Sequence, residues 1–179
     1  AVIVANNAMD IVFVNRTATA LFNQITSDPT YGGQAFETRN VNSLTVADLP
    51  GCSTNTQTAL KTLDRSLTNE LTIGSRSLQI VSNPVIADNG ERLGAIMVWN
   101  DRTAEVSIEN KVDSVVQAAR AGDLSKRIDD SGLNGCYARL SAGVNSLVEV
   151  AEQVIGDTLR VLSAVDKGDL RETIDHEYL

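Results

Sequence analysis

Two hydrophobic periods divide the chain. Up to about residue 100, short apolar runs alternate with polar clusters. The clearest run is 93–100, in which successive side chains alternate at period two and both sets are rich in apolar residues. This pattern predicts a strand with both faces covered. From residue 104 onward the apolar residues recur at steps of three and four, which predicts helices. The change of period places a sheet domain over about 1–104, followed by a helical part.

Five segments have strand character. They are 2–5, 11–14, 70–73, 77–81 and 93–100, and Asp88, Asn89 and Gly90 supply a tight turn before the last. Helical patterns at 16–22, where Asn15 is a helix-capping residue, and at 54–67 fall between the second and third strands. We therefore predict an α+β domain: a five-stranded antiparallel sheet with its helices on one face.

The helical part carries narrow apolar stripes on otherwise polar helices. The first stripe is Val106, Val112, Val115, Val116 and Ala119. The second is Leu140, Val144, Leu147, Val148, Ala151, Val154, Ile155, Leu159, Leu162 and Val165. Such a stripe is typical of a bundle helix that needs partner helices. Two helices per chain predict a parallel four-helix bundle in a homodimer.

A short motif occurs twice in this part. GDLSKRID at 122–129 recurs as GDLRETID at 168–175, offset by 46 residues. Gly122, Asp123 and Leu124 interrupt the first helical stripe, and a loop-like segment follows up to residue 135. The repeat predicts two copies of one helix–connector–helix unit.

The composition of the chain excludes some classes of binding partner. The net charge of −8 argues against nucleic acid or an anionic membrane as the main partner. No run of about 18 apolar residues is present, so we expect no membrane contact by this segment. Cys52 and Cys136 are too far apart for metal-ligand spacing, and two reduced thiols fit a cytoplasmic location. Ala1 opens directly into a strand without an initiator methionine, so we expect an internal fragment of a longer chain.

No catalytic or metal-binding set emerges. The single histidine, His176, lies among Asp175 and Glu177, and no triad can be built around it. The acidic pair Asp129 and Asp130 lies in the connector, where solvation or capping explains it. The segment is therefore expected not to be an enzyme.

The junction motif Asp101-x-Thr103 is the starting point of a resemblance to a known family. Asp101 or Thr103 can cap the helix that begins near residue 104. The stretch 82–105 resembles the end of a PAS domain of bacterial methyl-accepting chemotaxis receptors, and the helix–GDL–connector–helix pattern resembles a HAMP domain. The resemblance implies a PAS sensor domain at 1–104, a HAMP domain at 105–154 and the start of a second HAMP unit at 155–179.

That resemblance implies a sensory and relay region of a chemotaxis receptor. The signal-relay residues would be Asp101, Thr103, Gly122, Asp123 and Leu124. In the full-length receptor the implied partners are a chemotaxis adaptor and a histidine kinase. Two alternatives remain: the input region of a sensor histidine kinase or cyclase, and a dimerisation and relay module without a ligand.

The cofactor of the PAS cavity is unknown from the sequence. Related chemoreceptor PAS domains bind heme through a histidine and use a tryptophan on the last strand, which Trp99 matches. The Phe-His pair of those relatives falls on Leu49 and Pro50, so we expect no histidine-ligated heme; Cys52, two residues on, is the alternative thiolate ligand. The residues expected to line the cavity, or to fill it as core, are Trp99, Ile80, Leu78, Met97, Leu71 and Leu60.

Overall fold

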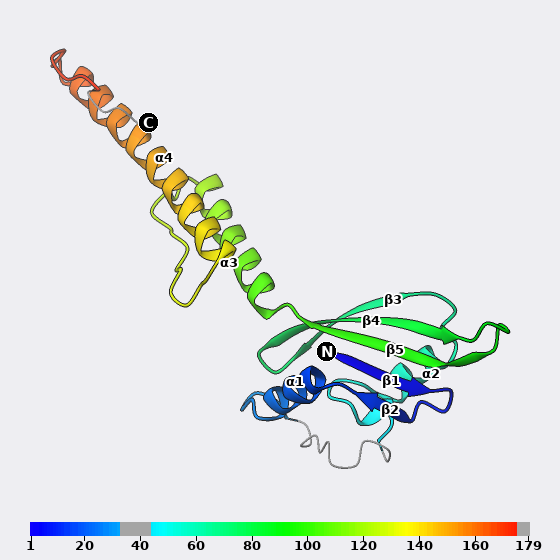
Figure 1. Cartoon of the computed structure of the whole chain (residues 1–179). Helices are drawn as coiled ribbons and strands as arrows, with labels where there is room; N and C mark the ends of the chain where they lie inside the picture. Colours follow the sequence, from blue (N-terminus) through cyan, green and yellow to red (C-terminus); the bar gives the residue numbers. More distant parts are fainter. Residues whose placement is uncertain (33–43, 175–179) are drawn as a thin grey trace. The chain divides into compact units, whose positions relative to one another are not determined.

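The computed structural model describes residues 1–32 and 44–174. The chain divides into two compact units, Ala1–Ala104 and Glu105–Leu179. The first unit holds every strand of the described residues, and the second is helical (Figure 1). Each unit is described by itself below.

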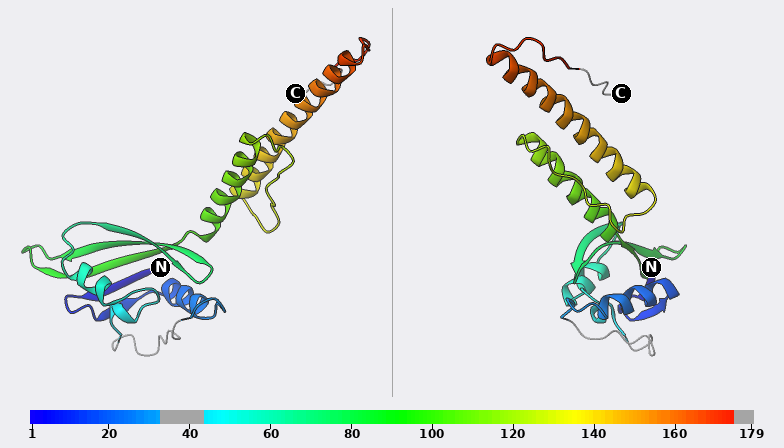
Figure 2. Two further views of the ribbon diagram at one scale, coloured as in Figure 1. Left: turned by 180° about the vertical axis from the view of Figure 1, so that it is seen from behind. Right: turned by 90° about the vertical axis from the view of Figure 1, so that its left-hand side faces the viewer.

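The first unit is built on a five-stranded antiparallel sheet. Its strands are β1 (Val2–Asn6), β2 (Ile11–Val14), β3 (Leu67–Ile73), β4 (Arg76–Ile86) and β5 (Arg92–Asp101), in the spatial order β2-β1-β5-β4-β3. Between β2 and β3 come α1 (Arg16–Thr26), the 3-10 helix η2 (Val46–Asp48) and α2 (Thr54–Lys61). Figure 2 shows these helices on one face of the sheet. The predicted antiparallel sheet and its helical insertion are confirmed.

Local chemistry explains the element boundaries. Asn15 caps α1, since its side-chain oxygen accepts the backbone N–H of Ala18. The same oxygen also accepts the N–H of Val2, which ties the start of β1 to the helix. At the β4–β5 turn, Gly90 has a positive φ of 82° and its N–H bonds to the Ala87 carbonyl. The predicted cap and turn are both confirmed.

The boundaries of α1, α2, β3 and β4 differ most from the sequence prediction. α1 continues to Thr26, and β4 is a single strand of eleven residues rather than ending at residue 81. α2 ends at Lys61, so Leu67 belongs to β3 and not to the helix. Leu67 lies half-buried against the core, which explains why its apolar character matched both patterns.

The buried core lies between the sheet and the helices. It gathers the inner-face residues of all five strands, the apolar side of α1 and single residues of η2 and α2. Its largest fully buried members are Trp99, Phe22, Ile3, Met9, Ile11, Ile25, Leu49, Leu60, Leu78, Met97 and Val46.

The two faces of β5 are not equally covered. On the inner face Ala95, Met97 and Trp99 are buried, whereas Ile96 and Val98 on the outer face are half-buried. Leu93 falls at an irregularity in the β4–β5 pairing and is 50% exposed. The prediction that both faces are covered is therefore wrong for Leu93. At a bulge the side chains no longer alternate regularly between the two faces of the strand, so Leu93 is left exposed.

The helix α3 (Thr103–Arg120) begins with the last two residues of the first unit and otherwise belongs to the second. The second unit also contains α4 (Cys136–Asp166), which an irregular connector joins to α3. Its core is Ile108, Val115 and Ile128, packed with Val112, Leu133, Tyr137, Val144 and Val148. Val116, predicted in the buried stripe, is 45% exposed, because the neighbouring Val115 takes the inward position. None of the helices in the described residues combines the length and the hydropathy that a membrane span requires.

Candidate functional site: a cavity and a junction

The first unit contains a cavity of about 280 Å³ under α2. Leu67, Ser82 and Met97 are paired neighbours on β3, β4 and β5, so they form one row across the sheet beneath it. The residues that line the cavity are Cys52, Asn55, Thr56, Ala59, Leu60, Leu67, Asn69, Ile80, Ser82 and Met97. The cavity thus lies between the helical wall and the sheet, with apolar and hydrogen-bonding side chains in similar number.

Only some of the six residues predicted to bind a ligand line the cavity. Leu60, Ile80 and Met97 line it. Leu78 and Trp99 are buried in the adjoining core, and Leu71 packs against that core half-buried. The assignment of all six residues to a ligand site stays a prediction.

Trp99 is held as a core residue. Its side chain is 1% exposed, and its ring meets Phe22 edge to face, with centroids 5.1 Å apart and planes at 89°. Its indole Nε1 has no hydrogen-bond partner among the described residues. Trp99 lines a separate hollow of about 240 Å³ beside α1, together with Asp101 and others.

The donor set of the cavity does not fit a histidine-ligated heme. The lining residues include no histidine, and His176 lies outside the described residues. Burial raises the pKa of the Cys52 thiol to about 12, so this side chain is a neutral thiol at physiological pH rather than the thiolate that binds iron. Pro50 is buried and has no ligating atom. What remains is one thioether, Met97, among hydroxyls and amides.

A hydrogen-bond cluster joins the last strand to α3. The Asp101 carboxylate accepts the backbone N–H of Thr103 at 3.0 Å, the Thr103 hydroxyl, and the guanidinium of Arg76. The Thr103 hydroxyl in turn accepts the N–H of Ser77 at 3.1 Å, and the Arg102 N–H bonds to the Ser77 carbonyl at 2.8 Å. The first residue of α3 is therefore bonded both to the end of β5 and to the start of β4.

Charge reinforces this junction. Desolvation raises the pKa of Asp101, but the hydrogen bonds from Thr103 and Arg76 outweigh it and the pKa lies below its usual value. A second ion pair, Arg102 with Glu70 at 3.1 Å, links the same turn to β3. The predicted capping pair thus acts differently from a simple N-cap: Asp101 takes the first helical N–H, while Thr103 bonds back to the sheet.

The GDL motif is a helix stop in both copies. At the end of α3, Gly122 has φ of 87°, its N–H bonds to the Ala119 carbonyl, and the Asp123 N–H bonds to the Ala118 carbonyl. At the end of α4, Gly168 has φ of 81°, and Gly168 and Asp169 repeat the same two bonds. This is the Schellman arrangement, which glycine favours because it adopts positive φ without strain. Leu124, the third motif residue, is half-buried beside it.

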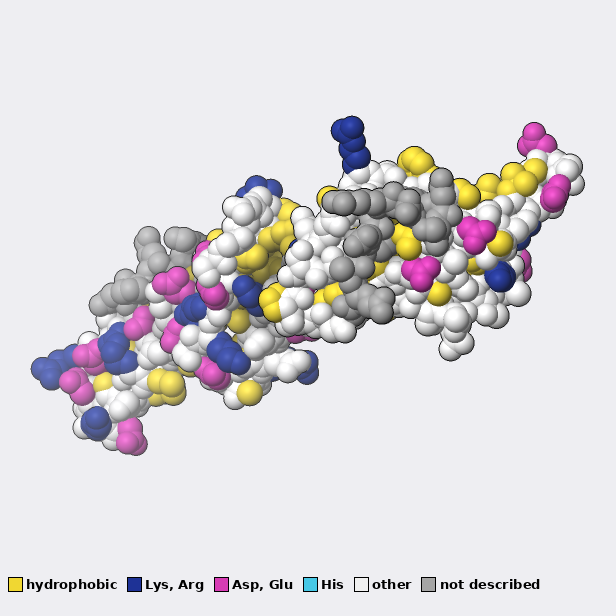
Figure 3. Space-filling model, turned by 90° about the horizontal axis from the view of Figure 1, so that it is seen from below, with side chains coloured by type: hydrophobic (Ala, Val, Ile, Leu, Met, Phe, Trp, Pro, Cys, Tyr) yellow, Lys and Arg dark blue, Asp and Glu magenta, His cyan; other side chains and the backbone are white. Residues whose placement is uncertain are grey.

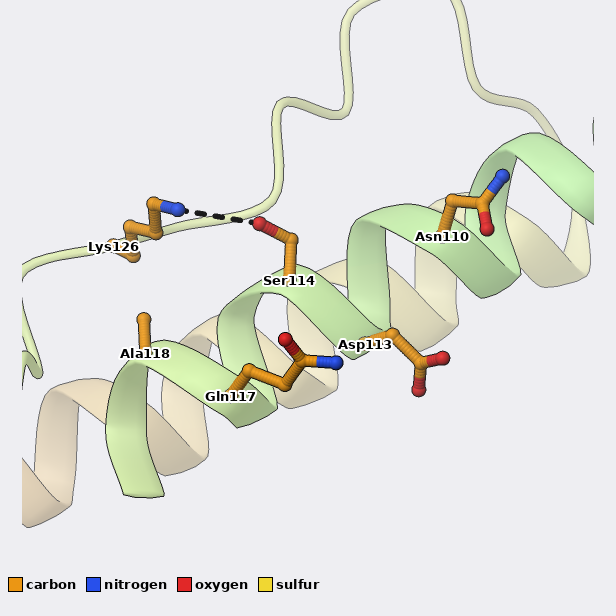
Figure 4. Close-up of a pocket in the computed structure, with 6 residues that line it drawn as sticks. All are labelled: Asn110, Asp113, Ser114, Gln117, Ala118 and Lys126. Atoms are coloured by element: carbon orange, nitrogen blue, oxygen red, sulfur yellow. Dashed lines mark hydrogen bonds between the residues drawn. The ribbon is translucent and has the colours of Figure 1, made fainter. Parts of the chain in front are cut away.

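The connector after the first GDL is fastened to both helices. The Asn145 side chain of α4 accepts the Ile128 N–H at 2.7 Å and donates to the Ile128 carbonyl at 3.0 Å. Lys111 of α3 donates to the Asp129 carbonyl at 2.8 Å. Figure 4 shows the residues that line a polar hollow along α3, where Lys126 of the connector donates to Ser114 at 3.2 Å. These bonds hold the 3%-exposed Ile128 in the helical core.

The contact between Ser114 and Lys126 has an equivalent in the second copy of the repeat. Ser114 and Lys126 of the first copy correspond to Arg160 and Glu172, at the repeat offset of 46 residues. Arg160 and Glu172 are also bonded to one another, as an ion pair. The sequence repeat is therefore a structural repeat over the described residues, with a hydrogen bond in one copy replaced by an ion pair in the other.

A row of apolar side chains on α4 faces solvent in the single chain. Leu147 is the most exposed of them, at 74%. The others are Leu140, Val154, Ile155, Leu159, Leu162 and Val165. Figure 3 shows apolar side chains lying among interspersed acidic and basic ones on the helical unit. Val144 and Val148, predicted in the same stripe, instead pack inside the unit.

Sequence reasoning missed several residues that build these sites. Ser82 and Asn69 line the cavity, Arg76 completes the junction, and Asn145 holds the connector. Ser82 was detectable in principle, because it is the polar position in the buried alternation Leu78, Ile80, Ser82. The long-range bonds of Arg76 and Asn145 have no local signature.

Comparison with known proteins gives one clear homologue. The chain is 32% identical over 177 residues to the methyl-accepting chemotaxis protein McpB of Pseudomonas aeruginosa. The alignment takes in 99% of this chain but 26% of McpB, so the chain spans about a quarter of the length of this relative. No family model matches the chain.

Two solved structures are similar in part. One is the Aer2 receptor of Vibrio cholerae, described as a dual PAS-heme oxygen sensor: 13% identity, TM-score 0.48, over 56% of this chain and 91% of the other. The second is the sensor region of a sensor histidine kinase: 13% identity, TM-score 0.43, over 59% and 40%. The predicted relationship to chemotaxis receptors is confirmed by the McpB match.

Proposed function

We propose that this homologue of a methyl-accepting chemotaxis protein is the sensory and relay segment of a chemotaxis receptor. In this proposal the cavity of the first unit senses a small ligand or a cellular state, and the helices of the second unit pass the state on. The segment is not itself an enzyme. Chemotaxis adaptor and histidine kinase are the proposed partners of the full-length receptor, and the proposed location is cytoplasmic.

One observation carries the proposal: the Asp101–Thr103 junction. Its bonds involve β4, β5 and the first residue of α3 at once. A ligand that shifts these strands also changes what holds the start of α3. Allosteric coupling requires about 1–3 kcal/mol, and a few hydrogen bonds are of that size. The free energy of the junction bonds is thus small enough for ligand binding to shift it without unfolding the domain.

The test is made in the full-length receptor. Asp101→Asn keeps the side-chain volume but removes the charge that Arg76 and Thr103 bind. We expect the activity of the associated kinase to change at an unchanged receptor level. Glu91→Gln, on the distant β4–β5 turn, removes the same charge and should leave the output at the parental value. Equal outputs from both variants would contradict the relay role.

We also propose that histidine-ligated heme is not the cofactor. The absence of a histidine among the lining residues and the neutral Cys52 thiol support this. Reconstitution with hemin, followed by absorption spectroscopy, is expected to give no histidine-type Soret band. A saturable band of that type would overturn the proposal.

The segment is proposed to act as a homodimer through a parallel four-helix bundle. The exposed row on α4 supports this, because large apolar side chains at three-, four- and seven-residue steps are typical of a helix interface. Leu147→Asp should weaken the dimer in sedimentation, since burying an unpaired charge is costly. Gln153→Asp adds the same charge on an exposed polar position and should not. Val144→Asp is a poorer test, because Val144 packs within the unit.

A further inference from the structure

We propose that the cavity under α2 binds a compact, uncharged molecule that has both an apolar body and a hydrogen-bonding group. This inference deepens the proposed sensory role by giving the class of ligand. It rests on the lining of the cavity, on unpartnered polar side chains within it and on its size.

Charge is the first argument. None of the residues that line the cavity is acidic, basic or a histidine, and Cys52 is a neutral thiol. A charged ligand there would lose its hydration without meeting a counter-charge, which is costly in a partly apolar site. The lining therefore selects against carboxylates, phosphates and amines.

Unpartnered hydrogen-bonding groups are the second argument. Ser82 is 2% exposed and stands in the buried row between Leu67 and Met97. Within the described part of the chain no hydrogen bond of the Ser82 or Asn69 side chain is found, and both line the cavity. The Ser82 hydroxyl borders the open space of the cavity, so a ligand or a water molecule there can form the hydrogen bond that the protein does not supply.

Shape is the third argument. Leu60, Ile80 and Met97 give the cavity an apolar wall, while the exposed side chains of Asn55 and Asn69 mark its open side. Its volume of about 280 Å³ lies just below the range typical of sites for drug-sized ligands. The ligand is thus small, with its hydrogen-bonding group at Ser82 or at the amide-lined mouth.

The two methionines of the chain allow a direct test. Met97 lines the cavity, whereas Met9 is fully buried in the core away from it. In protein labelled with ¹³C at the methionine methyl groups, phenol and indole serve as neutral probes and benzoate as the charged one. We expect saturable shifts of the Met97 signal with phenol and indole, no such shift with benzoate, and an unmoved Met9 signal.

Two variants make the test specific. Ser82→Ala leaves no protein group unpaired, so the fold should persist, while phenol affinity should fall about three- to tenfold as one hydrogen bond is lost. Toluene, which has no hydroxyl, should bind the variant and the parent equally. Ala59→Met places a larger side chain in the helical wall and should reduce binding of every probe.

The outcomes separate this inference from the proposed function. If no neutral probe moves the Met97 signal more than the Met9 signal, the cavity is solvent-filled space and the inference is wrong. If benzoate binds as well as phenol, the cavity binds ligands but the proposed uncharged class is wrong. Because binding is read without any receptor output, a failed kinase test with intact probe binding would refute the relay and leave the cavity assignment standing.

Discussion

The Thr103 hydroxyl offers the sharpest test of how the sheet domain holds its output helix. Thr103→Val keeps the branched shape of the side chain and removes the hydroxyl. That deletes the bond from the Ser77 N–H at 3.1 Å and the bond to the Asp101 carboxylate. The bond from the Thr103 N–H to Asp101 remains. Thr103→Ser is the matched control, because it retains the hydroxyl.

The magnitude follows from these two bonds. A hydrogen bond with a neutral partner contributes about 0.5–1.5 kcal/mol, and one to a charged group about 1.5–3 kcal/mol. The Asp101 side chain is 31% exposed, so solvent reduces the charged contribution. We therefore expect a loss of about 1–2 kcal/mol, which corresponds to about 5- to 30-fold faster opening of the first turns of α3.

Hydrogen exchange measures this locally. Amides over 104–120 should exchange faster in Thr103→Val, while those of β4 and β5 keep the protection of the parent. Thr103→Ser should stay close to the parent in both regions. If the strands lose protection as much as the helix, the motif is chiefly a fold-stabilising contact. If neither region changes, the hydroxyl does not hold the helix and the reasoning is refuted.

Three further predictions concern the junction and the helical unit. The pKa of Asp101 in the folded protein lies below its unfolded value, so the stabilisation of the junction is fully present above about pH 4 and is lost as the pH falls through the folded pKa. Hydrogen exchange of the first α3 amides should therefore become faster at low pH. This pH dependence should be weaker in Asp101→Asn. Asn145→Ala should lower the free energy of unfolding of the helical unit by about 1–3 kcal/mol in denaturant and release the connector, because both Ile128 backbone groups lose their partner. Ser146→Ala, at the exposed neighbouring position, should be neutral. Gly122→Ala should cost about 1 kcal/mol in thermal unfolding from its positive φ alone, since its added Cβ meets nothing within 4 Å, and Gly143→Ala, inside α4, should instead be neutral or stabilising.

Local signals predicted the sheet domain well. The alternation at 93–100, the turn at Gly90 and the Asn15 cap are short-range patterns, and each is confirmed. Helix and strand limits near Leu67 were mistaken, because a half-buried leucine fits a helix and a strand pattern equally. The bulge at Leu93 depends on pairing with β4, which a single segment does not reveal.

The candidate sites were less predictable than the fold. The alternation of apolar residues in the strands identified which side chains face inward, but not which of them border a cavity and which pack against a helix. Trp99 fills the core against Phe22, while Met97, two residues earlier on the same face, borders the open space. That difference arises from the path of α2 over the sheet, a long-range feature. Ile128 lies in a loop, as predicted, but its burial was not predicted because it depends on Asn145, seventeen residues away.

The repeat also defines how the helical unit is composed. At the offset of 46 residues, Thr103 and Arg120, the ends of α3, correspond to Glu149 and Asp166, and Asp166 is the last residue of α4. The final part of α4 therefore corresponds to the whole of α3, and the Schellman stop falls at the same place in both copies. On this register the second repeat begins near Glu149, six residues before the predicted boundary at 155, and no helix break separates the two copies. The single continuous helix α4 therefore contains both the end of the first copy and the start of the second.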